Sequence, residues 1–366
     1  MSDRLYPFIM EPKVTPAIWG GDALVRRYAK PGPRDARLGE SWECWDENRV
    51  LNGSFAGKTL GELRAELRET LTGPIDPDRI FPVLTKIIDA REPLSVQVHP
   101  DDAYAQRVEH QPNGKAECWY ILECEPGAEL VLGWARDTTR EEYERRVADG
   151  TLGEILRRVP VRPGDAYYLP AGTLHAIGAG IQLFETQQAS DLTYRIFDWN
   201  RSGADGKPRE LHVAKAGDVL DYRATYPGAM LQLSYARDGL EHTVLIADPR
   251  FSVERVTVTR TEAYVETDGR PLTITAMDAH LRVDTLDASV VLEPWQTIVT
   301  PAAVDRVALI PGGEPTRALL VRPQPDLEAA RARALAAGCA RPAVEAFFAQ
   351  FGGVARGTPA AAPTAR

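Results

Sequence analysis

Residues 164–175 read GDAYYLPAGTLH, and this stretch says more about the fold than any other. Gly164 is followed after five residues by Pro170, after one more by Gly172, and after a further two by His175. Proline and glycine at such positions end one strand and turn the chain into the next. Packing alone gives no reason for a histidine to follow such a turn, so we expect His175 to have a chemical role.

A second stretch, PLSVQVHP at residues 93–100, alternates as a strand does. The alternation puts the side chains of Ser95, Gln97 and His99 on one face. If that face lies inside a barrel, burying three polar groups is unfavourable unless hydrogen bonds or a metal satisfy them. Taken alone, the stretch is better explained as the solvent side of an edge strand.

The third stretch is GKAECWYIL at residues 114–122. Strand alternation sets Lys115, Glu117 and Trp119 on one face, whereas Cys118 faces away and is a poor ligand candidate. A single glutamate on a strand is usually just solvated. The turn at residues 170–174, followed by His175, reverses that interpretation, because the three stretches together supply two imidazoles and a carboxylate.

Together the three stretches predict one metal site. Its ligands are the imidazoles of His99 and His175 and the carboxylate of Glu117, with the amide oxygen of Gln97 as a fourth candidate. Such a set without a thiolate suits Zn²⁺ with an open position for water or substrate. Mn²⁺, Fe²⁺ and Co²⁺ also accept nitrogen and oxygen ligands, so the ligand set alone leaves the metal open.

Other segments extend the pattern along the chain. Short β-rich runs broken by Pro and Gly recur at residues 235–322, where Pro301 and Arg306 occupy the places of the proline and the histidine of the first run. We expect this run to form a second barrel without the metal ligand. Leucines at helical spacing from Leu60 to Leu71, opened by Thr59, predict a surface helix.

Residues 138–159 begin with threonines, continue with acidic residues and end with arginines, which predicts a helical excursion between the signature segments. An Ala-rich helical segment is expected after the proline-containing link VRPQPD at residues 321–326.

The signature segments resemble those of the cupin superfamily. The resemblance implies a mainly β fold, with two cupin-type (jelly-roll) β-barrels and a few peripheral helices. A length of 366 residues fits two or three packed units. The expected units are residues 1–225, the N-terminal region and catalytic metal-binding barrel; 226–323, the second, metal-less barrel; 324–355, a C-terminal helical segment; and 356–366, a disordered tail.

The charge balance restricts the partners of the chain. Lys plus Arg number 43 against 52 Asp plus Glu, and the net charge of −9 disfavours binding to nucleic acid or to an anionic membrane. The first residues do not form a signal peptide, and no stretch approaches ~18 uninterrupted apolar residues. We expect a soluble cytoplasmic protein whose four cysteines are reduced thiols.

The chain also resembles the type I mannose-6-phosphate isomerases (phosphomannose isomerases), in their short bacterial form. The resemblance is strongest over residues 81–217 and faint in the second barrel. The matching stretches are FPVLTKIIDAREPLSVQVHPDDAYA (81–105), GKAECWYIL (114–122), VPVRPGDAYYLPAGTLHAIGAG (159–180) and ETQQASDLTYRIFDWNR (185–201), with WGGDAL (19–24) and GESWE (39–43) near the start.

This resemblance implies a role for several side chains. It implies a metal, usually zinc and one per chain, held by Gln97, His99, Glu117 and His175. It implies catalysis by Arg195 of the TYR motif, and substrate contacts from Ser95, Lys86 and Lys115. Relatives commonly read EIQQ and SDTTYR where this chain has Thr186 and Leu192, but neither difference removes a titratable group.

The implied reaction interconverts mannose 6-phosphate and fructose 6-phosphate through an enediolate, and therefore moves a proton between neighbouring carbons. A divalent cation can stabilise the developing negative charge, and Arg195 supplies a permanent forked cation. Glu185 is our candidate for the base. A water chain or the surroundings of His99 could serve instead, and an ordinary ion-paired glutamate explains Glu185 equally well.

Two alternatives remain open at this stage. The two-His, one-carboxylate set also suits an Fe(II) cupin dioxygenase, although the cations around the site argue against it. A non-catalytic cupin that binds a sugar phosphate is the other alternative. In each case we expect a small-molecule partner, no nucleic acid and no membrane, and a monomer or a homodimer.

Overall fold

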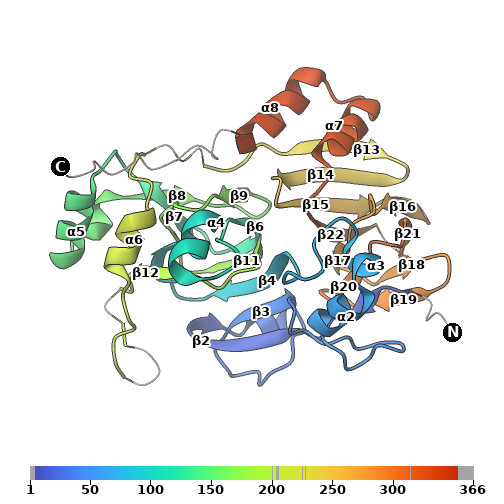
Figure 1. The fold of residues 1–366 in the computed structure, drawn as a ribbon, viewed down its shortest axis with the longest axis horizontal. Helices are drawn as coiled ribbons and strands as arrows, with labels where there is room; N and C mark the ends of the chain where they lie inside the picture. The colour runs from blue at the N-terminus through green and yellow to red at the C-terminus, as the bar shows by residue number, and fades with distance from the viewer. Residues whose placement is uncertain are drawn as a thin grey trace.

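The computed structural model describes residues 5–199, 201–202, 206–224, 226, 228–313 and 315–352. These residues form two β bodies that lie side by side, with helices at the periphery (Figure 1). Within the described residues, none of the helices has the length and apolar character needed to cross a membrane. The expectation of a mainly β, cupin-type fold is confirmed.

The first body consists of two antiparallel sheets. The six-stranded sheet has the order β2 (Lys13–Gly21), β3 (Leu38–Cys44), β4 (Val83–Ala90), β11 (Ile181–Gln188), β6 (Glu117–Cys124) and β9 (Ala166–Leu169). The five-stranded sheet has the order β12 (Tyr194–Phe197), β5 (Val96–Val98), β10 (His175–Ile177), β7 (Glu129–Trp134) and β8 (Leu156–Pro160). Large buried side chains such as Trp119 and Tyr167 fill part of the interior.

The second body repeats this design. Its seven-stranded sheet has the order β1 (Phe8–Ile9), β20 (Thr297–Thr300), β17 (Leu272–Ala276), β22 (Thr316–Pro323), β15 (Phe251–Val258), β14 (Leu240–Ala247) and β13 (Leu233–Arg237). The four-stranded sheet has the order β16 (Ala263–Glu266), β21 (Arg306–Pro311), β18 (Leu281–Asp284) and β19 (Ser289–Leu292). Strand β1 pairs with β20, so the first strand of the chain lies in the second body.

The two bodies carry the same turn with different residues after it. Pro170 follows β9 and His175 begins β10, whereas Pro301 follows β20 and Arg306 begins β21. His175 is buried, but Arg306 is exposed and its guanidinium lies over the ring of Tyr264. A buried aliphatic cluster fills the space between the sheets of the second body.

The helix predicted from Thr59 begins there but is shorter than expected. Thr59 and Glu62 form a capping box at the start of α2 (Leu60–Leu67). Arg68 then adopts a positive φ of 49°, which ends the helix, and Leu71 lies in the separate α3 (Glu69–Thr72). The prediction of one helix from Leu60 to Leu71 is therefore wrong at its end.

The helical excursion expected over residues 138–159 is likewise too long. The α5 helix (Arg140–Ala148) stops before Gly150, whose φ of +70° suits a helix end. A short 3-10 turn, η2 (Leu152–Ile155), follows, and from Leu156 the chain joins β7 as strand β8. Sheet pairing thus takes over the last part of the predicted helix.

The remaining helices are short or C-terminal. They are α1 (Ala23–Arg26), α4 (Asp102–Tyr104), the π-helix η1 (Ala105–Glu109), α6 (Val213–Val219), α7 (Leu327–Ala336) and α8 (Arg341–Gly352). The helices α7 and α8 follow the link at residues 321–326, after which an Ala-rich helical segment was expected. They lie next to β13 at the top of Figure 1. All four cysteines are free, as predicted. The expected tail 356–366 lies outside the described residues.

Candidate active site

Three predicted ligand residues meet inside the first body. His99 follows β5 and His175 begins β10 in one sheet, while Glu117 begins β6 in the other. Nε2 of His175 lies 3.2 Å from Oε1 of Glu117, and Nε2 of His99 lies 3.4 Å from Oε2. All three side chains are buried, and their candidate ligand atoms lie within 4.8 Å of one another. The cluster could therefore hold one metal ion.

The two imidazoles are oriented by backbone carbonyls. Nδ1 of His99 lies 2.7 Å from the carbonyl oxygen of Leu192, and Nδ1 of His175 lies 2.8 Å from that of Thr173. A carbonyl only accepts, so each Nδ1 carries the hydrogen, and the Nε2 lone pairs face Glu117. This arrangement is typical of metal-binding histidines.

The carboxylate of Glu117 is fully buried, and no described residue donates a well-oriented hydrogen bond to either oxygen. Such an oxygen costs free energy unless a cation satisfies it. Nζ of Lys115, 3.0 Å from Oε2, offsets part of the charge. The donor set therefore fits a divalent cation.

Burial and the charges of the cluster keep the ligand atoms of His99 and Glu117 unprotonated. Burial, followed by the ammonium of Lys115, lowers the pKa of His99 to about 3. Burial alone would raise the pKa of Glu117, but Lys115 and the two imidazoles outweigh it and hold that pKa well below its usual range. At neutral pH, an imidazole lone pair of His99 and the carboxylate charge are both available.

The remaining candidate ligand, Gln97, lies in a row across the five-stranded sheet. Its Cα pairs with His175 on one side and with Arg195 on the other, so the three side chains share a face. The amide nitrogen of Gln97 lies 3.2 Å from Nε2 of His175. Rotation of the amide would present its oxygen instead.

A buried ion-pair network lies beside the cluster. Nζ of Lys86 is 3.1 Å from Oε1 of Glu185 and 3.5 Å from Oε2 of Glu40, and it lies over the ring of Trp42. Trp119 donates from Nε1 to Oε2 of Glu185 at 3.0 Å. Burial would lower the pKa of Lys86, but Glu185 and Glu40 outweigh it and raise that pKa. Both lysines predicted to bind substrate thus have buried carboxylate partners.

The other two predicted site residues differ in their surroundings. Ser95 is buried just before β5. Arg195 is partly buried on β12, where Nη1 donates to the carbonyl oxygen of Glu210 at 3.1 Å. Burial, and then the charge of Arg209, lowers the pKa of Arg195.

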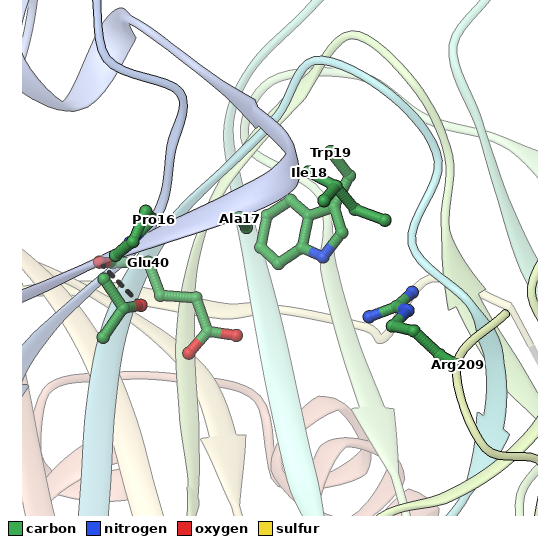
Figure 2. A pocket seen from close by; sticks show the side chains of 7 residues that line it. Pro16, Ala17, Ile18, Trp19, Glu40 and Arg209 are labelled. Carbon is green, nitrogen blue, oxygen red and sulfur yellow. Dashed lines mark hydrogen bonds between the residues drawn. The ribbon is translucent and has the colours of Figure 1, made fainter. Parts of the chain in front are cut away.

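A cavity of about 350 Å³ adjoins the network. Its lining consists of Thr15, Pro16, Ala17, Ile18, Trp19, Glu40 and Arg209. Figure 2 shows the carboxylate of Glu40 and the guanidinium of Arg209 pointing into it from opposite sides, near the indole of Trp19. Glu40 links the cavity to the network through Lys86.

Our reading of the sequence gave no role to Trp19, Glu40 or Arg209. The only signal was that the first two lie in the WGGDAL and GESWE stretches. A Cβ on Gly39 would lie 2.6 Å from the indole of Trp19, and one on Gly20 would lie 2.5 Å from the carbonyl carbon of Leu38. These glycines therefore allow the close approach of β2 and β3 that forms one side of the cavity.

The paired sheets and the buried His-Glu-His cluster define a cupin-fold protein with a candidate metal centre. Residues 8–130 match the family model of the phosphomannose isomerase type I catalytic domain. A mannose-6-phosphate isomerase of Bacillus subtilis is 45% identical over 223 residues, which are 59% of this chain and 68% of the relative. A mannose-6-phosphate isomerase of Streptococcus mutans is 40% identical over 252 residues, which are 68% of this chain and 77% of the relative.

Solved structures agree with these matches. A crystal structure of a mannose 6-phosphate isomerase from B. subtilis superposes with a TM-score of 0.79 at 33% identity, covering 86% of this chain and 99% of the other. A putative mannosephosphate isomerase from Archaeoglobus fulgidus shares the fold, with a TM-score of 0.70 at 21% identity over 88% and 100% of the chains. The chain belongs to the type I phosphomannose isomerase family, which confirms the resemblance inferred from the sequence.

Proposed function

We propose that this protein is a metal-dependent isomerase that interconverts mannose 6-phosphate and fructose 6-phosphate. The observation that carries the proposal is the buried cluster of His99, Glu117 and His175, in a chain of this family. Zinc, one ion per chain, is the proposed metal, because two imidazoles and a carboxylate without a thiolate suit it. Gln97 is the proposed fourth ligand.

The reaction removes a proton from C2 of the aldose and returns one to C1. The hydroxyl on C2 also loses its proton, and the oxygen on C1 gains one, so that the proton balance is closed. A bound divalent cation supplies charge stabilisation for the sugar oxygens. Arg195 contributes a second, permanent cation from the same sheet face as Gln97 and His175. Burial of the cluster excludes bulk water and strengthens these electrostatic interactions.

Glu185 remains our candidate for the base. Lys86 and Trp119 hold its two oxygens in a fixed orientation, and each oxygen keeps a lone pair for a substrate proton. If Glu185 is only an ion-pair partner, Glu185→Gln will alter stability and leave the exchange of the C2 proton with solvent unchanged. If it is the base, that exchange will be lost while metal content stays the same.

The proposal includes the division of the chain into units. Residues 1–225, apart from β1, which pairs with β20 of the second body, would form the catalytic unit and 226–323 the second barrel, with Ser95 close to the bound substrate. The partner would be a sugar phosphate rather than nucleic acid or a membrane, and the protein would act in the cytoplasm as a monomer or a homodimer.

The deciding experiment is a coupled assay on mannose 6-phosphate before and after chelation, with zinc added back. We expect activity to disappear on chelation and to return with the ion. Metal-loaded protein that exchanges no label between the two sugars would overturn the proposal. Binding of sugar phosphate without product would favour a non-catalytic binding protein, and oxygen consumption with iron bound would favour a dioxygenase.

A further inference from the structure

Two arginines share a single carboxylate next to the cavity, and a third lies close by. Nε and Nη2 of Arg209 each donate to Asp198 at 2.6 Å, and Nη2 of Arg201 donates to the same carboxylate at 2.7 Å. Arg195 lies close to Arg209. Burial, and then the charge of Arg209, lowers the pKa of Arg195. Three guanidinium charges against the carboxylate of Asp198 and that of the exposed Glu210 leave a local excess of positive charge.

Several donors of this group lack an acceptor. Nε of Arg195 and Nη1 of Arg201 are buried without a hydrogen-bond partner among the described residues. Asp198 occupies one edge of the Arg209 guanidinium through Nε and Nη2, which leaves Nη1 to bind another group. Buried N–H groups and unbalanced cations are both costly, so an anionic ligand would stabilise this arrangement.

The two lysines inside the site do not provide a comparable excess of positive charge. Lys86 lies between the carboxylates of Glu40 and Glu185, and Lys115 lies against Glu117. Each lysine charge is therefore already offset by a buried carboxylate. A phosphate placed there would meet carboxylates at close range, which is repulsive in a poorly solvated interior.

The two sides of the cavity carry opposite charges. Arg209 lies on one side and Glu40 on the opposite side (Figure 2). A dianion is attracted to the first and repelled by the second. Sugar hydroxyls can donate to the carboxylate of Glu40, and the C–H face of the sugar can pack on the indole of Trp19. A sugar phosphate would thus bind with its phosphate at the arginine side.

We propose that Arg209, oriented by Asp198, binds the phosphate group of the sugar phosphate and so determines specificity for phosphorylated sugars. This inference rests on the proposed function. A planar guanidinium with free N–H groups matches a phosphate monoester, which carries a charge of about −2 and three acceptor oxygens. Asp198 is a positioning residue, because it fixes the guanidinium and does not touch the substrate.

The distance to the metal cluster suits this role. The Cα of Arg195 pairs with that of Gln97, and the Cα of Gln97 pairs with that of His175. The Cα atoms of Arg195 and His175 are therefore two strand spacings, roughly 10 Å, apart across the sheet. Arg209 is held by Asp198, which directly follows β12, the strand that carries Arg195. The phosphate end of the site is then at Arg209, with Arg195 between it and the proposed metal. A hexose phosphate extended along this row would place its carbonyl end near the metal and Arg195.

The test compares Arg209→Gln with Arg223→Gln in metal-loaded protein. Arg223 is a matched control, because its Nε and Nη2 also hold an aspartate, Asp221, in the same two-bond manner, but its side chain is exposed and does not line the cavity. For Arg209→Gln we expect KM for mannose 6-phosphate to rise roughly 10- to 100-fold with little change in kcat. Arg209→Lys should recover part of the loss, and Arg223→Gln should behave as the parent protein.

Asp198→Asn tests the positioning role. We expect it to raise KM for mannose 6-phosphate by a smaller factor than Arg209→Gln and to leave kcat unchanged. A purely structural role would lower kcat and raise KM together, and that result would overturn the assignment of Asp198.

Calorimetry with mannitol 6-phosphate and with mannitol, neither of which can be isomerised, separates this inference from the proposed function. Arg209→Gln should weaken binding of the phosphate ester and leave binding of mannitol unchanged. Equal binding of the ester by the variant and the parent protein would overturn the inference. A parent protein that binds the ester through Arg209 but converts no mannose 6-phosphate would overturn the proposed function alone.

Discussion

The backbone N–H of Gly172 donates to the carbonyl oxygen of His99 at 2.9 Å. Gly172 belongs to the turn that precedes His175, so this bond ties the backbone of one candidate ligand to the turn that positions the other. The carbonyl of Gly172 in turn accepts from the N–H of Asp221 at 2.9 Å. The turn is thus held from both sides, and the spacing between the two histidines depends on it.

Gly172→Ala should therefore disturb both stability and the metal site. The residue has a φ of +86°, and an added Cβ would lie 2.9 Å from the carbonyl oxygen of Val219. Backbone strain of about 1–2 kcal/mol and a further 1 kcal/mol or more from the contact are expected as loss of unfolding free energy. Chelator competition should also show weaker metal binding.

Gly164→Ala is the matched control for that change. Gly164 has a φ of +96°, but an added Cβ would meet nothing within 4 Å. We expect only the strain cost of about 1–2 kcal/mol and normal metal affinity. Equal loss of metal in both variants would show that the bond between Gly172 and His99 does not set the site.

His99→Ala and Arg195→Ala should separate metal binding from catalysis. Removal of the His99 imidazole is expected to reduce metal affinity by at least ~100-fold and to abolish turnover. Arg195→Ala should abolish turnover and leave metal content unchanged. Metal analysis of the purified variants, with a coupled isomerase assay, measures both effects.

The control for these variants is His280→Ala, because His280 is an exposed histidine of the second body. It should keep both metal and activity. Loss of metal in Arg195→Ala would contradict the division of roles, since it would make Arg195 part of the metal site.

Lys86→Met should be strongly destabilising. The change leaves the buried carboxylate of Glu185 and the partly buried carboxylate of Glu40 without their shared cation. Breaking a buried ion pair from one side costs about 3–5 kcal/mol of unfolding free energy, which denaturant titration will measure.

Lys13→Met provides the comparison, because Lys13 also pairs with a glutamate and lies over the ring of Trp42, but at the surface. It should change the unfolding free energy by less than about 1 kcal/mol. Similar losses in both variants would mean that burial does not govern the energy of the Lys86 network.

The pH dependence of stability should contain a contribution from Glu254 in the second body. Its Oε1 lies 2.7 Å from Nδ1 of His242, and its Oε2 lies 3.4 Å from Nη1 of Arg322. Burial alone would raise the pKa of Glu254, but His242 and Arg322 outweigh it and hold that pKa below its usual value. A depressed carboxyl pKa stabilises the fold above the unfolded pKa, and the contribution disappears as the pH falls through the folded pKa.

Glu254→Gln should consequently lower the unfolding free energy by about 2–3 kcal/mol at pH 7. The difference from the parent protein should stay constant down to about pH 5 and shrink below about 4.3, the ordinary pKa of a glutamate. The exposed Glu241 of β14, changed to Gln, should show no such step. A difference that grows on acidification would contradict the sign of the shift.

Local patterns predicted several features correctly. Strand alternation predicted a common face for Gln97 and His99, and both side chains lie at the cluster. The glycine and proline pattern predicted a turn before His175, and that turn separates β9 from β10. These features depend on residues two to five positions apart, so the chain's own periodicity determines them. The end of α5 was mispredicted because pairing of β8 with β7 competes with helix formation, and that competition depends on a distant segment.

The sequence by itself determined the two barrel-forming patterns and the types of side chain that could bind a metal, because both follow from spacing along one strand or turn. Only the tertiary structure decided which cations are already paired. The register of β11 against β4 brings Glu185 opposite Lys86, and the fold brings Asp198 to Arg209 beside the cavity. Such contacts join segments far apart along the chain, and the electrostatic energy of each depends on the burial that the complete fold provides.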